Sequence, residues 1–167
     1  GGIGADSITL SGTTTNVGFG FAYESLAEST ISKMDVISAE KVASGEGLTA
    51  GMTFTFSAVT KTLTTGAVAA GDGFSANVFG GIISGGYFSE DAGTAAGLTA
   101  RVALLDGATT TLGQTFVFEA GSNEYLFIQG GSTGTADDLV AKIGSGQTLS
   151  NTNTLSFTSG MISIGNS

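Results

Sequence analysis

The chain opens Gly1-Gly2-Ile3-Gly4-Ala5-Asp6-Ser7-Ile8-Thr9, which matches at every specified position the frame G-G-x-G-x-D-x-U-x, where U is a large apolar residue. This frame repeats in parallel β-rolls, whose successive coils stack strand on strand. The glycines allow a tight turn that residues with side chains do not readily follow. Ile8 is expected to point into the narrow core, and Asp6 to direct its carboxylate toward a cation between coils. The segment therefore predicts one coil of a parallel β-roll, with Gly4 and Asp6 as candidate calcium ligands.

Asp6 has an alternative role, because an aspartate in a turn can accept a hydrogen bond from its own backbone. One repeat also leaves a metal site incomplete, since each ion in a roll is shared between stacked coils. Partner oxygens for Asp6 must therefore come from another coil or from another chain.

Acidic residues dominate the charge, because 14 Asp and Glu against 5 Lys and Arg give a formal net charge of −9 over 167 residues. The length suits one domain, or a short roll fused to a compact module. The scattered basic residues form no patch that could neutralise phosphates, which argues against nucleic acid as a partner. No apolar run reaches the length that crosses a bilayer, so no membrane insertion is expected. An acidic surface instead suits divalent cations.

The chain has no Cys, His, Trp or Pro. Without His or Cys it cannot form a Ser-His-Asp triad, a cysteine nucleophile or a zinc site of the usual nitrogen and sulfur type. A bound metal must be held by oxygen, which favours calcium. Paired carboxylates are the remaining basis for catalysis, yet no pair stands out, and the aromatic residues alternate within predicted strands as core residues do. We therefore predict no enzyme and no catalytic residue.

The periodicity predicts a mainly β protein, in which the end of a calcium-binding parallel β-roll runs into a β-sandwich-like module with one short helix. Apolar residues alternate with small or polar ones at a period of two in residues 17–23, 52–57, 155–157 and 161–164. Further strands are predicted at 34–37, 59–63, 114–120, 124–129 and 139–143, with short strands also expected within 66–88. We assign residues 1–23 to the terminal coil and adjoining strand, and residues 24–167 to the β-rich module; the two can also form one continuous domain.

Two local structures are expected within the module. The runs 114–120 and 124–129 flank Gly121-Ser122-Asn123, which predicts a β-hairpin. A helix is predicted from about residue 90 to residue 105, with Ser89 as its N-cap and Gly107 at its C-terminal stop.

Four further acidic residues are candidate metal ligands. Asp137 and Asp138 close the loop 130–136 between two predicted strands, where adjacent carboxylates repel unless a cation lies between them. A solvated acidic turn explains the same pair equally well. Asp35 and Glu28 flank the start of an apolar strand, and each could serve as a calcium ligand in the same way.

The order of segments resembles the C-terminal region of RTX-type proteins exported by type I secretion, particularly the surface-layer and adhesin-like members. The resemblance is carried by Gly1 to Thr9, by 21–37 and by 123–140. In such proteins these segments are the last coil of a calcium roll, the stretch that follows it, and a hairpin leading to an Asp-Leu-Val strand, here Asp138-Leu139-Val140. The chain departs from that pattern after Ile37, where Ser38 to Val42 replace an expected Phe and second Asp.

The resemblance implies a secreted structural protein at the cell surface that assembles with calcium into a surface layer or similar array. Copies of the chain are then its main partners, with a cell-surface polysaccharide as a second candidate. The alternative is a non-catalytic C-terminal module that carries secretion and folding information for an RTX hydrolase or adhesin. The absence of Pro favours self-assembly, because Pro commonly blocks association at strand edges.

Overall fold

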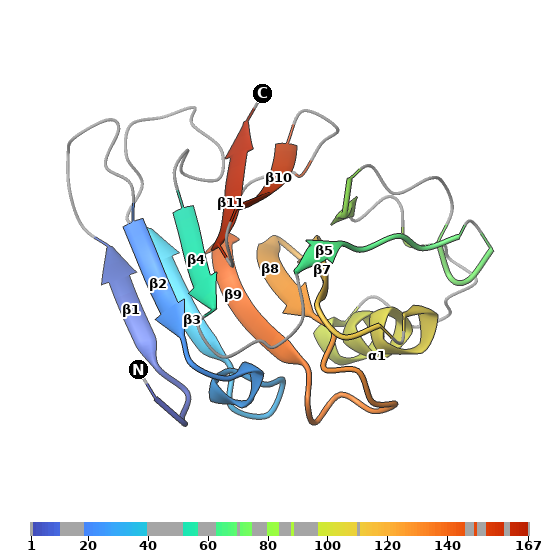
Figure 1. Ribbon diagram of the computed structural model, residues 1–167, viewed down its shortest axis with the longest axis horizontal. Helices are drawn as coiled ribbons and strands as arrows, with labels where there is room; N and C mark the ends of the chain where they lie inside the picture. The colour runs from blue at the N-terminus through green and yellow to red at the C-terminus, as the bar shows by residue number, and fades with distance from the viewer. Residues whose placement is uncertain are drawn as a thin grey trace.

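The computed structural model describes residues 2–10, 19–39, 52–56, 63–69, 71–74, 80–83, 88, 97–109, 111–145, 149, 153–158 and 161–166. Within these residues the protein is mainly β, as predicted, with one short α-helix (Figure 1). No described helix is long and apolar enough to cross a membrane. Residues 59–62 and 90–96, where the sequence predicts part of a strand and the start of the helix, lie outside the described residues.

The larger sheet, sheet A, has seven described strands in the order β1-β3-β9-β8-β7-β5, and β6 also pairs with β7. Their bounds are β1 Ser7–Leu10, β3 Asp35–Ala39, β5 Thr64–Thr65, β6 Ile82–Ile83, β7 Gln114–Ala120, β8 Asn123–Ile128 and β9 Leu139–Ser145. The pairs β7-β8 and β8-β9 are antiparallel, whereas β1-β3 and β3-β9 are parallel, so the sheet is mixed.

The smaller sheet, sheet B, has four described strands in the order β10-β11-β4-β2. Their bounds are β2 Phe19–Tyr23, β4 Met52–Phe56, β10 Asn153–Thr158 and β11 Met161–Asn166. β10 and β11 form an antiparallel hairpin, and β11 also runs antiparallel to β4. The period-two alternation predicted for these four segments is therefore realised as one sheet.

The first four strands alternate between the two sheets. β1 and β3 pair in parallel in sheet A, with Ser7 opposite Val36, and β2 and β4 pair in parallel in sheet B, with Phe19 opposite Met52. The chain therefore passes from sheet A to sheet B twice in the same direction. These pairings also cross the predicted boundary after residue 23, so the strands on its two sides share both sheets.

One hydrophobic core lies between the two sheets. Sheet A contributes apolar residues from β3, β7, β8 and β9, and sheet B contributes Tyr23, Ile162 and Ile164. The inward residues alternate along each strand, as the period of two requires. Burial of this shared core holds the two sheets together in a sandwich-like arrangement.

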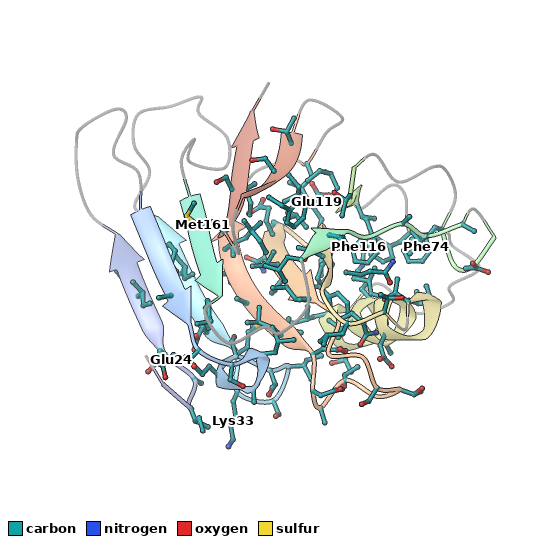
Figure 2. All side chains as sticks on the ribbon, viewed as in Figure 1. Glu24, Lys33, Phe74, Phe116, Glu119 and Met161 are labelled. Atoms are coloured by element: carbon teal, nitrogen blue, oxygen red, sulfur yellow. The ribbon has the colours of Figure 1, made fainter. Side chains whose placement is uncertain are left out.

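A second core covers the other face of sheet A. Phe116, Phe118 and Phe127 project from β7 and β8 and pack with Val102 and Leu105 of the helix α1. Phe116 and Phe74 lie on the side of the molecule that holds α1 (Figure 2). The central strands of sheet A are therefore buried on both faces, which explains why β7 and β8 read as nearly continuous apolar runs.

The predicted hairpin is confirmed, with a tighter turn than expected. Asn123 pairs with Ala120 and belongs to β8, so the connection is only Gly121 and Ser122. Gly121 has a φ of 64°, a left-handed conformation that glycine adopts without steric cost.

The predicted helix exists, but both of its expected ends are wrong. α1 spans Leu98–Ala108, and its N-cap is Gly97 in an extended conformation rather than Ser89. Gly107 lies inside the last turn, and Thr109 follows as the C-cap, donating its backbone N–H to the carbonyl of Leu105 at 3.1 Å. Packing of Val102 and Leu105 against sheet A explains why the helix tolerates the internal glycine.

Candidate functional site

The structure brings the predicted ligands Asp6 and Asp35 together at the start of β1 and β3. Asp35 is buried, and its Oδ1 atom accepts the backbone N–H of Asp6 at 2.9 Å. The backbone N–H of Val36 returns a hydrogen bond to the carbonyl of Asp6 at 2.8 Å. The carboxylate of Asp35 thus continues the ladder between the two parallel strands.

Ser29 connects the same point to β9. Its buried hydroxyl donates to the carbonyl of Val140 at 2.5 Å and accepts the backbone N–H of Asp35 at 2.9 Å. The side chain of Ser29, between η1 (Leu26–Glu28) and β3, therefore joins the start of β3 to β9, which is distant in sequence.

Tyr23 links sheet B to this cluster through a side-chain hydrogen bond with Asp35. Burial raises the pKa of Tyr23 well above its ordinary value, and the negative charges of Asp35, Glu28 and Asp6 raise it further. The phenol is therefore neutral across the physiological pH range and serves as a donor to Asp35.

Three other residues that the sequence singles out, Gly2, Gly4 and Glu28, lie in the described segments before β1 and β3. Gly2 has a φ of 100°, which fits the glycine turn expected of the opening nonapeptide, and Gly4 is half-buried beside it. Glu28 uses its Oε1 atom in a capping box, accepting the backbone N–H groups of Glu24 at 2.8 Å and Ser25 at 3.0 Å. Asp35 and Glu28 thus bond to protein donors, and their role as calcium ligands stays a prediction.

Asp137 and Asp138 lie at the end of the loop between β8 and β9, as expected. The Oδ1 atom of Asp138 accepts the backbone N–H of Gly130 at 2.9 Å, and the Oδ2 atom of Asp137 accepts that of Ser132 at 3.1 Å. Asp138 is fully buried, which rules out a solvated turn for this residue. Gly130 is required here, because a Cβ atom at this position would overlap the carbonyl of Asp137.

A third carboxylate, that of Asp106, joins this loop from the last turn of α1. Asp106 is buried, and its Oδ2 atom accepts the backbone N–H of Gly134 at 2.8 Å. Gln129 approaches its Oδ1 atom at 3.4 Å and donates to the carbonyl of Thr109 at 2.5 Å. Asp106 is not among the ligands predicted from the sequence, although a carboxylate near the C-terminal end of a helix is an unfavourable placement that marks such a residue.

The electrostatics of this group centre on Asp138. Burial raises its pKa to about 7, against the lowering effect of the hydrogen bond from Gly130, and the charges of Asp106 and Asp137 add to the rise. Its Oδ2 atom is buried and has no hydrogen-bond partner among the residues that the structure describes. We call Asp106, Asp137 and Asp138 the acidic loop cluster. Within the described ranges, no group of three or more acidic side chains is arranged to hold a metal ion.

A second buried pair of acids lies on the β7-β8 hairpin. Glu119 and Glu124 stand directly opposite each other in the register and are 8% and 0% exposed. Glu119 accepts the backbone N–H of Leu149 through Oε1, and its own carbonyl accepts a hydrogen bond from Arg101 at 2.6 Å. The guanidinium of Arg101 also stacks over Phe88, 4.3 Å from the ring centroid. Sequence reasoning assigned these glutamates to the hairpin alone.

Comparison with known proteins identifies no relative, because no family model, no curated protein and no solved structure matches the chain.

Proposed function

We propose that this chain is a non-catalytic structural module of an extracellular array, which binds calcium and associates with copies of itself. The observation that carries the proposal is the buried Oδ2 atom of Asp138, which no described donor satisfies and which lies close to two further carboxylates. A buried carboxylate of this kind is stabilised either by a proton or by a cation.

Calcium is the cation that fits the donors present. The acidic loop cluster offers only oxygen, and hard divalent cations prefer carboxylate and carbonyl oxygens. Each of its three carboxylates already accepts a backbone N–H group through one oxygen. These oxygens are Asp106 Oδ2, Asp137 Oδ2 and Asp138 Oδ1. Asp138 Oδ2, which accepts no hydrogen bond from a described residue, would then be the principal ligand. A site with so few charged ligands suits the weak calcium affinity of extracellular modules, about 10⁻⁴ to 10⁻³ M.

The first four strands support the roll that the opening nonapeptide predicts. Their alternation between the sheets, with parallel pairing of every second strand, is the connectivity of two successive coils. Because Asp35 is engaged by Asp6 and Tyr23, calcium at this end of the protein would use Asp6 with oxygens of a neighbouring coil. Among the described strands, β1 lies at one edge of sheet A, and this edge favours the alternative function, a module that follows the coils of a longer secreted protein.

The experiment is thermal unfolding in millimolar calcium and in chelator, for the wild type and for Asp138→Asn. If calcium binds only the folded state with this affinity, the wild type gains about 0.4–1.4 kcal/mol in 1 mM calcium, which is one to ten times the Kd. Asp138→Asn should lose this gain, whereas Asp72→Asn, which removes an equal charge from an exposed residue, should keep it. An identical melting temperature of the wild type in calcium and in chelator would overturn the calcium assignment.

A further inference from the structure

We infer that the outer face of sheet B is the surface through which two copies of this chain associate, an inference that rests on the proposed self-assembly. The face is defined by the outward residues of β2, β10 and β11, together with the positions of β4 that lie in register between them. The described outward residues are Gly20, Ala22, Thr154, Ser156, Met161 and Ser163.

The alternation along the strands identifies this face. Phe21, Tyr23, Ile162 and Ile164 belong to the core between the sheets, so the residues between them point the other way. Gly20, Ala22, Thr154 and Ser156 are exposed, and no described element covers them. Helix α1 lies against sheet A and away from this face (Figure 1).

Charge is the first argument for a second copy as the occupant. The four strands of sheet B contain no Asp, Glu, Lys or Arg, although the chain carries a formal net charge of −9. Two identical acidic molecules repel each other least when they meet through their uncharged faces.

Shape is the second argument. The register aligns Gly20, Ser163 and Ser156 in one row across the sheet, so the described side chains of this row are only glycine and serine. Small residues let two sheets approach to about 10 Å or less, the spacing of stacked sheets. Met161, which is half-buried beside β4, offers a flexible apolar contact in the next row (Figure 2).

The chemistry of the face argues against other occupants. Its described residues carry no charge to bind an ion or a phosphate, and the aromatic residues Phe21, Tyr23 and Phe157, which could stack on a sugar ring, point into the core instead. Its four strands of about five residues span roughly 300 Å² per copy, from strand spacings of about 4.8 Å and rises of about 3.4 Å. A stable dimer buries about 800 Å² per partner. The contact is therefore weak alone and suits a lattice with several contacts per molecule.

The test compares two variants in which an exposed alanine is replaced by glutamate, so that both gain the same charge at different places. Ala22→Glu places a carboxylate on the outer face of sheet B, whereas Ala103→Glu places one on the exposed side of α1. Sedimentation velocity over rising protein concentration in millimolar calcium should show association of the wild type and of Ala103→Glu. Ala22→Glu should associate at least tenfold more weakly. Equal association of all three proteins would overturn the assignment of this face and leave the proposed self-assembly standing.

A second measurement does not depend on added charge. The chain has no Cys, so a single cysteine reports only contacts between copies. Ser163→Cys lies on the inner strand β11, where a two-fold axis through the face brings the residue near its counterpart. Oxidation should trap a disulfide dimer of Ser163→Cys and not of Ala103→Cys. A wild type that stays monomeric at every concentration, with no trapped dimer, would overturn both this inference and the proposed self-assembly, while calcium binding is judged separately by the melting experiment.

Discussion

The carboxylate of Asp35 accepts the backbone N–H of Asp6 at 2.9 Å, so a side chain on one parallel strand completes the ladder to the next. The two residues occupy equivalent places, because the register pairs Ser7 with Val36 directly after them. Tyr23 adds a hydrogen bond from sheet B to the same carboxylate. Asp35, at the start of β3, therefore bonds both to the residue before β1 and to β2 of sheet B.

Replacing Asp35 should destabilise the protein, and the loss should be smaller where the new side chain still offers an oxygen to accept hydrogen bonds from Asp6 and Tyr23. Asp35→Ala leaves the N–H of Asp6 and the hydroxyl of Tyr23 without their acceptor, at about 1–3 kcal/mol for each donor that stays buried. Asp35→Asn keeps one oxygen and should lose less. Urea denaturation at neutral pH in chelator measures both free energies of unfolding. If Asn and Ala cost the same, the carboxylate oxygens do not act as acceptors for these groups.

Tyr23→Phe should destabilise the protein by about 1.5–3 kcal/mol, because it removes a hydrogen bond to a charged group in a buried setting. Tyr125→Phe is the matched control. Tyr125 is equally buried, but its ring stacks on Phe118 and its hydroxyl bonds to the neutral Asn123, so a loss nearer 1 kcal/mol is expected. Calorimetry of the three proteins gives the comparison. Equal losses would show that the link between Tyr23 and Asp35 has no special weight.

The stability of the calcium-free protein should fall as the pH rises from about 4 to about 7. Asp138 has a pKa of about 7 in the folded protein, against about 4 for an ordinary aspartate, so the folded state binds more protons in this window. Because the pKa is raised on folding, protonation of Asp138 stabilises the folded state fully when the pH is below the pKa of the unfolded state. This stabilisation is lost as the pH rises through the pKa of the folded state. The slope should approach about −1.4 kcal/mol per pH unit between the two values.

Asp138→Asn isolates this contribution, because the amide stays neutral at every pH. Its free energy of unfolding in chelator should lack the decline between pH 4 and pH 7 that the wild type shows. Asp72→Asn, at an exposed site, should follow the wild-type curve. The same decline in Asp138→Asn would assign the titration to another group.

The sequence predicts local structure well and long-range partners poorly. The hairpin of β7 and β8 follows from two apolar, β-rich runs on either side of a glycine, all within one short segment. The contact between Asp106 and Gly134 joins residues 28 apart, and that between Ser29 and Val140 joins residues 111 apart. No periodicity encodes such pairs, because they arise only when the helix and the loop pack on sheet A. The sequence therefore predicted Asp137 and Asp138 of the acidic loop cluster, and not Asp106.

Gly107 and Gly130 should respond in opposite ways to replacement by alanine. Gly107 lies within α1, is exposed, and has no atom within 4 Å of the position that a Cβ would take. Alanine there should raise the free energy of unfolding by about 0.5–1 kcal/mol, since it restricts the unfolded chain and favours the helix. At Gly130 a Cβ would lie 2.6 Å from the Cγ of Asp137, so the loop must shift. Alanine there should lower the free energy of unfolding by about 1–3 kcal/mol. Chemical denaturation reports both changes, and stabilisation by Gly130→Ala would mean that the loop does not hold Asp137 against this glycine.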